Sequence, residues 1–152
     1  KQTMKILVMG LPGAGKTYLA KILKAKLLCA YYNADDVRHL SSDFDFSLKG
    51  RLLQAERMRR LAVAELEKSS RVICDFICPT RRTREIFKPD VLIWLDTIKE
   101  SQYDDTNKMF EPPKNNKCDY IIKIKNGEYF GNVIASHILN GEFNANSNIL
   151  YA

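Results

Sequence analysis

This sequence has no long apolar run, no paired cysteines and no recognisable secretion signal. No stretch of about 18 apolar residues occurs, so no membrane-spanning helix is predicted. The first residues lack a basic segment followed by an apolar one, which predicts a cytoplasmic protein. The four cysteines form no CxxC pair, and the two histidines have no zinc-binding spacing. We therefore expect buried, reduced thiols and no zinc site.

The composition is that of one ordinary globular domain. The chain has 152 residues, of which 45% are hydrophobic and 28% charged, so a packed core can form. Repeats, low-complexity segments and linkers are absent. We predict a single domain over residues 1–143, followed by a loose tail over residues 144–152. The net charge of +6 is compatible with a nucleic acid or with a polyphosphate as partner.

Short apolar runs alternate with helical patterns along the chain. The apolar runs predict strands at residues 4–9, 29–33, 71–77, 91–95 and 119–125, and the spacing of apolar residues predicts helices at 16–28, 48–68 and 127–141. Strands that alternate with helices form a parallel sheet covered on both faces. The predicted fold is therefore a three-layer α/β/α sandwich around a five-stranded parallel sheet.

A glycine-rich loop follows the first predicted strand. Residues 10–17 read GLPGAGKT and match the pattern G-x-x-x-x-G-K-[ST] in full, with a strand before it and a helix after it. Glycines let backbone N–H groups turn toward a phosphate, Lys16 can reach the β and γ phosphates, and the Thr17 hydroxyl can bind Mg²⁺. The motif predicts ATP and Mg²⁺ as cofactors and a nucleotide-binding set of Gly10, Leu11, Pro12, Gly13, Ala14, Gly15, Lys16, Thr17 and Tyr18.

Chain length and missing motifs narrow the class of P-loop protein. A chain of this size leaves no room for an added motor module. The base-reading tetrad N-K-x-D of GTPases is absent, because Asn107 and Lys108 are followed by Met109 and Phe110. We therefore expect a small kinase with the P-loop NTPase fold of nucleoside and nucleotide kinases, in which Lys16 takes part in catalysis.

Acidic residues stand where predicted strands end. Asp35 follows the second strand, Asp75 ends the apolar part of the third, and Asp96 ends the fourth. Ligands of open α/β sheets bind outside the carboxyl ends of strands. Phosphoryl transfer needs a carboxylate near Mg²⁺ and another that orients the acceptor hydroxyl, so we assign Asp75 to the metal with Thr17, and Asp35 to the acceptor. The alternative is that each aspartate caps a helix, which we favour for Asp96 because Thr97 resembles a helix start.

Arginines follow the same strand ends. Arg38, Arg51 and Arg81 favour an anionic acceptor, because a guanidinium group binds phosphate or sulfate in a fork. The alternative, a solvated charged face, fits others such as Arg59 and Arg60. A nucleic-acid groove would place aromatic residues between the basic ones, so this partner is less favoured but stays open.

Four segments, in this order, resemble the adenylylsulfate (APS) kinase family. They are the P-loop at residues 10–17, NADDVRH at 33–39, DFDFS at 43–47 and FICPTR at 76–81. They are similar to the family's G-L-x-G-x-G-K-T, D-G-D-N-V-R-H, D-L-G-F-S and F-I-S-P-Y-R blocks. The resemblance covers about residues 4–100. It implies transfer of the γ-phosphate of MgATP to the 3′-hydroxyl of adenosine 5′-phosphosulfate.

The resemblance also implies roles for single residues. Asp35 falls on the catalytic aspartate of the family's D-G-D segment, and Phe46 falls on a phenylalanine that stacks on the acceptor's adenine. Residues 77–79 contribute through their backbone. The full acceptor-binding set implied in this way is Asp35, Arg38, Phe46, Arg51, Gln54, Ile77, Cys78, Pro79, Arg81 and, in the lid, Lys108.

The chain departs from the family pattern in the metal, acceptor and lid segments. Asn33 stands where D-G-D has its first aspartate, and Asp75 stands where the family has a small hydroxyl residue. Gln54 replaces an asparagine. The lid segment R-D-x-K-G-L-Y-x-K-A-R is replaced within residues 99–116, where Lys108 alone can supply part of the lid's charge. The new segment resembles that of short, often phage-encoded relatives, for which the compartment would be a host's cytoplasm.

Three hypotheses about function result, in order of preference. The first is an enzyme of the adenylylsulfate kinase type. The second is a P-loop kinase that acts on another anionic acceptor, such as a nucleotide, a polynucleotide end or a modified base, which the altered lid and the charge of +6 favour. The third is a nucleotide-binding regulatory module with little transfer activity, motivated by the lost carboxylate at Asn33. The expected partner is a small nucleotide-like anion, and a homodimer stays open.

Overall fold

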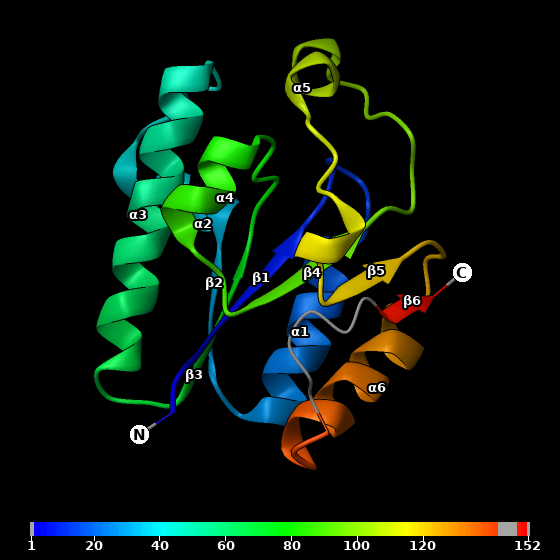
Figure 1. The fold of residues 1–152 in the computed structure, drawn as a ribbon. Helices are drawn as coiled ribbons and strands as arrows, with labels where there is room; N and C mark the ends of the chain where they lie inside the picture. The colour runs from blue at the N-terminus through cyan, green and yellow to red at the C-terminus, as the bar shows by residue number, and fades with distance from the viewer. Residues whose placement is uncertain (1, 143–148, 152) are drawn as a thin grey trace.

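A parallel sheet of six strands forms the middle of the molecule (Figure 1). The computed structural model describes residues 2–142 and 149–151. The strand order is β2-β3-β1-β4-β5-β6, and every neighbouring pair is parallel. The strands are β1 (Met4–Met9), β2 (Ala30–Asn33), β3 (Arg71–Asp75), β4 (Val91–Leu95), β5 (Tyr120–Ile122) and β6 (Ile149–Tyr151). The P-loop therefore leaves the sheet from a central strand.

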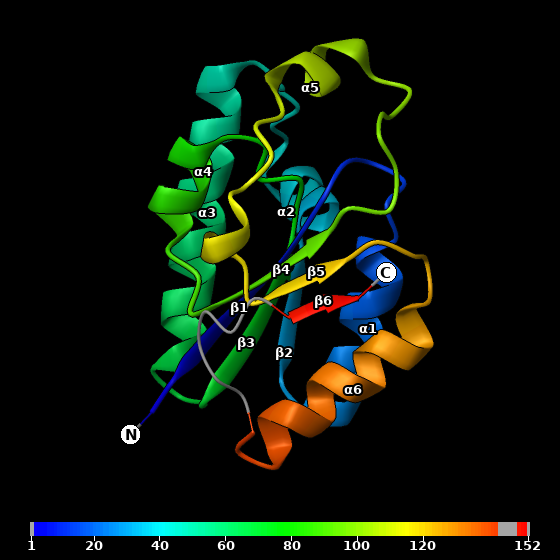
Figure 2. The same ribbon diagram turned by 45° about the vertical axis from the view of Figure 1, so that its right-hand side comes forward.

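Helices cover both faces of the sheet, as Figures 1 and 2 show. On one face α1 and α6 pack against Ile6 and Val8 of β1, and on the other α2, α3 and α4 pack against Leu7 and Met9. A strand that is buried on both faces alternates in this way between two cores. The three-layer α/β/α fold is therefore confirmed. The helices are α1 (Lys16–Leu27), α2 (Ala34–Ser41), α3 (Leu48–Leu66), α4 (Arg81–Phe87), α5 (Asp104–Met109) and α6 (Gly127–Leu139), with a 3₁₀ turn at Asn115–Lys117.

The last strand corrects two predictions. The sheet has six strands rather than five, and residues 149–151 pair with β5 instead of belonging to a loose tail. The physical reason is that β5 would otherwise be an edge strand with unpaired backbone groups, which an Ile-Leu-Tyr segment is suited to pair. The other residues of the predicted tail, 144–148 and 152, lie outside the described residues.

Three short helices have no counterpart in the apolar pattern of the sequence. They are α2, α4 and α5, and their buried side chains include polar ones, namely Arg38, Thr83, Arg84 and Thr106. Buried polar residues hide the helical period, which is why the pattern missed them. In the described part of the chain, no helix is both long enough and apolar enough to cross a membrane.

The segment after β4 is irregular rather than helical. No helix begins at Thr97, so the predicted capping role of this region is wrong. The Thr97 hydroxyl instead donates to the carbonyl oxygen of Ala14 in the P-loop, at 2.7 Å. Asp96 accepts a hydrogen bond from Lys123, which follows β5. Both side chains thus fasten the end of β4 to its neighbours, and α5 begins only at Asp104.

Candidate active site

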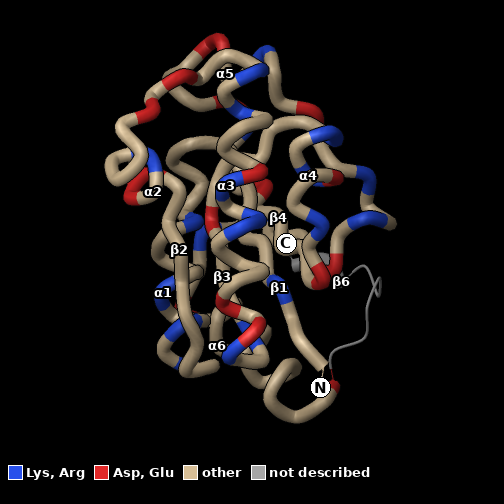
Figure 3. Tube along the Cα trace, turned by 90° about the vertical axis from the view of Figure 1, so that its left-hand side faces the viewer, with Lys and Arg blue, Asp and Glu red and all other residues tan. Residues whose placement is uncertain are grey.

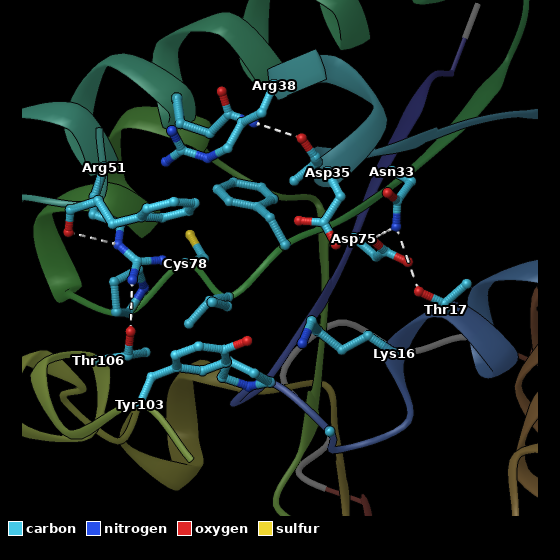
Figure 4. Close-up of a pocket in the computed structure, with 18 of the residues that line it drawn as sticks. Lys16, Thr17, Asn33, Asp35, Arg38, Arg51, Asp75, Cys78, Tyr103 and Thr106 are labelled. Carbon is cyan, nitrogen blue, oxygen red and sulfur yellow. Dashed lines mark hydrogen bonds between the residues drawn. The ribbon is translucent and has the colours of Figure 1, made fainter. Parts of the chain in front are cut away.

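A cavity of about 850 Å³ opens at the carboxyl end of the sheet (Figure 4). The segments that follow β1, β2 and β3 form three of its sides, which is where a parallel sheet binds ligands. Residues of α3 and of the lid segment around α5 complete it. Figures 1 and 2 both show α5 at the same end of the sheet as the loop after β1. The P-loop end and the lid end of the cavity differ in chemistry.

Backbone geometry explains the glycines of the P-loop. Gly15 is the N-cap of α1 with φ = 103°, and Gly13 has φ = 89°, both in the region that favours glycine. A Cβ atom on Gly10 would lie 2.8 Å from the carbonyl oxygen of Leu95. The loop therefore turns tightly beside β4 and presents the N-terminus of α1 to the cavity, where the helix dipole attracts a phosphate.

Lys16 lies along the inside of this loop. Its Nζ donates to the carbonyl oxygen of Leu11 at 3.1 Å. Burial lowers the pKa of Lys16, while the negative charges of Asp75 and Asp35 raise it in part. Of the predicted nucleotide-binding set, the cavity is lined by Pro12, Gly13, Gly15, Lys16, Thr17 and Tyr18. The other three residues of the loop are buried and do not line the cavity; they are Gly10, Leu11 and Ala14.

Four polar side chains meet beside the P-loop, at the ends of β2 and β3. Asn33 and Asp75 are register partners, and Nδ2 of Asn33 donates to Oδ1 of Asp75 at 2.9 Å (Figure 4). The same nitrogen lies 3.4 Å from Oγ1 of Thr17, and the hydroxyl of Tyr31 donates to Oδ2 of Asp75. Burial raises the pKa of Asp75, against the opposing effects of Tyr31, Lys16 and Asn33. Tyr31 is not among the residues predicted from the sequence, because a tyrosine in a strand gives no signal of a polar role.

The donor atoms at this end fit a Mg²⁺ ion. Magnesium prefers hard oxygen ligands, and kinases hold it with one or two protein oxygens together with substrate phosphates. The Thr17 hydroxyl and the Asp75 carboxylate both contact the Asn33 amide, so their oxygens lie close together beside the P-loop. These two residues are the ones that the sequence assigned to the metal, and they would hold the ion next to the phosphates.

Asp35 points into the cavity from the first turn of α2 (Figure 4). The side chain of Asn33 caps this helix by accepting a hydrogen bond from the backbone N–H of Asp36 at 3.1 Å. The cap fixes where the helix begins and therefore the direction of Asp35. The carboxylate of Asp35 is solvent-exposed, and it is near enough to Lys16 to raise the pKa of that lysine. It is placed to accept a proton from a hydroxyl group that faces the P-loop.

The other end of the cavity holds two arginines beside one phenylalanine. The guanidinium carbons of Arg38 and Arg51 lie 4.3 Å and 5.1 Å from the centre of the Phe46 ring. Arg38 donates to the carbonyl oxygens of Asp43 (3.0 Å) and Asp45 (3.2 Å), which fold the 43–47 turn around it. Burial lowers the pKa of both guanidinium groups, which nevertheless remain charged near neutral pH. Phe46 is 49% exposed, so part of its ring is free for a flat ligand.

Arg51 connects the end of the cavity that holds Arg38 and Phe46, called the acceptor end below, to the lid. Its Nη2 donates to Oγ1 of Thr106 in α5 at 2.7 Å, and its Nε donates to the carbonyl oxygen of Phe46 at 3.2 Å (Figure 4). Gln54, three residues further along α3, donates to the carbonyl oxygen of Ala34 at 3.1 Å and so joins α3 to the start of α2. Both side chains line the cavity and also brace its walls.

The lid presents a different surface from the predicted one. Tyr103, Asp104, Asp105 and Thr106 line the cavity, whereas Lys108 is exposed and does not. The structure therefore does not place Lys108 where the resemblance put it, in the cavity. Thr106 is held inward by its bond to the α3 arginine, and a side chain two positions further along a helix points to the opposite side. Figure 3 marks charges of both signs along the α5 segment, but the cavity side carries acidic ones.

Arg81 also lies away from the cavity, contrary to its predicted role. A capping box that begins at Thr80 starts α4 so that the Arg81 side chain is 83% exposed, and it pairs with Glu85 at 3.7 Å. Arg84 takes the inward position and donates to the carbonyl oxygen of Cys78 at 2.9 Å. That bond supports a backbone turn with φ = 48° at the cysteine. The turn carries the predicted lining residues Ile77, Cys78 and Pro79 along the cavity wall.

Three arginines at the surface of α3 and α4 pair with acidic neighbours. Arg59 and Arg60 both contact Glu56, and Arg82 lies 3.9 Å from Glu85. Figure 3 shows Lys or Arg alternating with Asp or Glu along these two helices. A surface of mixed sign is a solvated charged face and differs from the basic stripe that tracks a phosphate backbone. This observation weakens the nucleic-acid groove considered from the sequence.

Gly50→Ala is expected to loosen the acceptor end while leaving the P-loop intact. Gly50 is buried in α3, and a Cβ atom there would lie 2.0 Å from the carbonyl oxygen of Asp45. That oxygen accepts a hydrogen bond from Arg38, so the turn must shift and release the arginine. We expect the free energy of unfolding to fall by about 1–3 kcal/mol in denaturant titrations. Lys49→Ala, one exposed position earlier, is the control, and equal stabilities of the two variants would contradict the argument.

Comparisons with known proteins give the family of this chain. The family model described as adenylylsulphate kinase matches residues 2–93, which is more than half of the chain. The chain belongs to the adenylylsulfate kinase family. As a member of this family, it is a P-loop phosphotransferase. The matched part contains the P-loop, Asp35, Arg38 and Asp75, and it ends before the lid, so the lid is the part of the site that the match leaves undescribed.

Solved structures of kinases share the fold. One is an adenylylsulfate kinase of Mycobacterium tuberculosis in complex with AMPPNP and APS (18% identity, TM-score 0.72, covering 91% of this chain and 98% of that one). Another is the hexameric APS kinase from Thiobacillus denitrificans (24% identity, TM-score 0.68, covering 95% of this chain and 30% of that one). A third is a sugar kinase from Janibacter sp. HTCC2649 (14% identity, TM-score 0.69, covering 91% of this chain and 95% of that one). At these identities the likeness shows the fold alone. None of the curated proteins compared with the chain matches it.

Proposed function

We propose that this protein transfers the γ-phosphate of MgATP to a hydroxyl group of a small nucleotide-like anion, with adenosine 5′-phosphosulfate as the first candidate. The observation that carries the proposal is one cavity that joins the P-loop to Arg38, Phe46 and Arg51. An aromatic ring flanked by cations suits a nucleobase next to an anionic group. With this acceptor the reaction would belong to sulfate assimilation in the cytoplasm.

In the proposed reaction the acceptor's hydroxyl oxygen attacks the γ-phosphorus. The bond from that phosphorus to the β,γ-bridging oxygen breaks, and ADP leaves. Asp35 accepts the proton of the hydroxyl group, while Lys16 and the P-loop N–H groups stabilise the charge on the transferred phosphoryl group. Mg²⁺ bound beside Thr17 and Asp75 would neutralise further phosphate charge.

A direct assay tests the acceptor. The protein is mixed with MgATP and adenosine 5′-phosphosulfate, and the 3′-phosphorylated product is measured by chromatography. We expect product in proportion to the protein and none above background with Lys16→Ala. ATP consumption with a different acceptor, and none with this one, would overturn the named substrate but keep the kinase. Tight ATP binding without product from any acceptor would instead support a regulatory module.

The acidic side of the lid favours a second candidate, a kinase for a different acceptor. Asp104 and Asp105 line the cavity, whereas the family's lid motif carries arginine and lysine. Two carboxylates repel a phosphosulfate group and attract hydroxyl or amino groups, such as those of a modified nucleoside. A screen with labelled ATP against nucleosides, nucleotides and single-stranded DNA separates the two candidates.

The pair Asp104→Asn and Asp105→Asn is expected to strengthen binding of adenosine 5′-phosphosulfate. Removing an exposed charge near an anionic ligand changes affinity modestly, so we expect about two- to fivefold for each carboxylate. The gain should shrink as salt is added, because salt screens exposed charges. The measurement is the KM of the acceptor at low and high salt, with Glu100→Gln outside the cavity as the control. Weaker binding in the double variant would show that the lid acids attract the acceptor.

A further inference from the structure

Asn33 and Asp75, on two neighbouring strands, both depart from the family pattern that the sequence resembles. The D-G-D segment begins with a carboxylate where this chain has Asn33, and Asp75 stands where the family has a small hydroxyl residue. The register of β2 and β3 pairs these two residues with each other. Neighbouring strands lie about 4.8 Å apart. The charge missing from β2 is therefore present on β3, one strand away and at the same level.

We propose that Asp75 is the second carboxylate of this active site, transferred from β2 to β3, and that Tyr31 and Asn33 are the residues that position it. The inference rests on the proposed use of MgATP. It removes the reason for the hypothesis of a regulatory module, which was the lost carboxylate at Asn33. The site then retains two carboxylates, Asp35 and Asp75, on the same side of the P-loop. Figure 4 shows both of them with Asn33 between Asp75 and Thr17.

Both carboxylate oxygens of Asp75 accept hydrogen bonds, as a buried charge requires. A buried carboxylate is stable only when its oxygens are bonded, and Asp75 is 2% exposed. Oδ1 accepts from Asn33 at 2.9 Å, and Oδ2 accepts from the hydroxyl of Tyr31. Tyr31 and Asn33 are two residues apart on β2, so both side chains project from the same face of the sheet as Asp75, the register partner of Asn33. Each carboxylate oxygen thus has its own donor from the neighbouring strand.

The charges around Asp75 explain why residue 33 is an amide. An aspartate at that position would bring two carboxylates within the 2.9 Å that now separates the amide from Oδ1, and such a pair shares a proton instead of ionising twice. The Asn33 amide avoids this repulsion and reaches Thr17 as well. The charged groups that face Asp75 are Lys16 of α1, which favours its ionised form, and Asp35 of α2, which opposes it.

The test exchanges the two residues without changing side-chain volume. The variants are Asp75→Asn, Asn33→Asp and the double variant N33D/D75N, and calorimetry measures ATP binding with and without Mg²⁺. We expect Asp75→Asn to lose about 10- to 100-fold of the affinity that Mg²⁺ adds. The double variant should return to within about threefold of the parent, because the charge is again present once. This readout needs no acceptor, so a failure with adenosine 5′-phosphosulfate leaves it unaffected.

Tyr31→Phe tests the positioning role separately. The Tyr31 hydroxyl donates to Oδ2 of Asp75, so its removal takes away the donor that β2 supplies to this oxygen. We expect Tyr31→Phe to lose about tenfold of the affinity that Mg²⁺ adds while it binds ATP without Mg²⁺ as the parent does, a split that a merely structural role would not produce. Thermal unfolding of each variant confirms that it is folded. A folded double variant that binds MgATP no better than Asp75→Asn, or an Asp75→Asn variant equal to the parent, would overturn the proposal.

Discussion

Replacing Asp35 with asparagine is expected to lower the turnover number by about 10²- to 10⁴-fold, the usual contribution of a general base. The substitution keeps the size and the position of the side chain in the first turn of α2. It removes the carboxylate that would take the proton of the acceptor hydroxyl. Because the residue is exposed and belongs to α2 rather than to the P-loop, the affinity for ATP should change little. Turnover and nucleotide binding are measured on the same preparation.

The matched control for Asp35→Asn is Asp36→Asn. Asp36 is the next residue of α2, is equally exposed and does not line the cavity. Both variants lose one carboxylate from the same helix terminus, so any effect of the helix dipole is common to them. Only a loss confined to Asp35→Asn identifies a base at the reaction centre. Equal activities of the two variants would show that the acceptor proton leaves by another route.

The half of the site that would bind the phosphate donor, the P-loop, could be predicted from the sequence because the residues that form it are close together in the chain. The P-loop is continuous in the chain, and its glycines and Lys16 lie between a strand and a helix that apolar spacing alone predicts. The alternating burial of β1 likewise follows from the sequence, since a strand covered on both faces is apolar throughout. Such features need no knowledge of which strands are neighbours.

The acceptor half depends on contacts between distant segments. Arg38 of α2, Phe46 of the following turn and Arg51 of α3 come together only once both helices are placed, and resemblance to a family suggested them where periodicity did not. Arg81 and Lys108 were predicted to contact the acceptor, yet both lie outside the cavity for a local reason that spacing does not reveal. The capping box of α4 and the inward bond of Thr106 decide which side of each short helix faces the cavity. Tyr31 was missed because its partner lies on a neighbouring strand.

Lys16→Ala is expected to have the broadest effect of any single substitution. A charge-assisted hydrogen bond to phosphate contributes enough that ATP binding should weaken by about 10- to 100-fold. Loss of a cation that stabilises the transferred group should reduce turnover by about a further 10²- to 10³-fold. The hydrogen bond of the ammonium group goes to a carbonyl of its own loop, so its removal breaks no hydrogen bond to a distant segment. Lys21→Ala, an exposed position on the same helix, is the control, and an equal loss there would indicate general unfolding of α1.

The pH dependence of ATP binding gives a sharper test of the same lysine. Burial lowers the pKa of Lys16 below the ordinary value of 10.5. Its positive charge is therefore lost at a lower pH than that of an exposed lysine, and affinity for ATP should fall as the pH rises through this lowered pKa. Lys16→Arg keeps its charge over the whole range, so the alkaline fall should disappear even if the planar fork binds less well at neutral pH. An alkaline fall that persists in Lys16→Arg would mean that another group controls it and that Lys16 is not the charge that holds the phosphate.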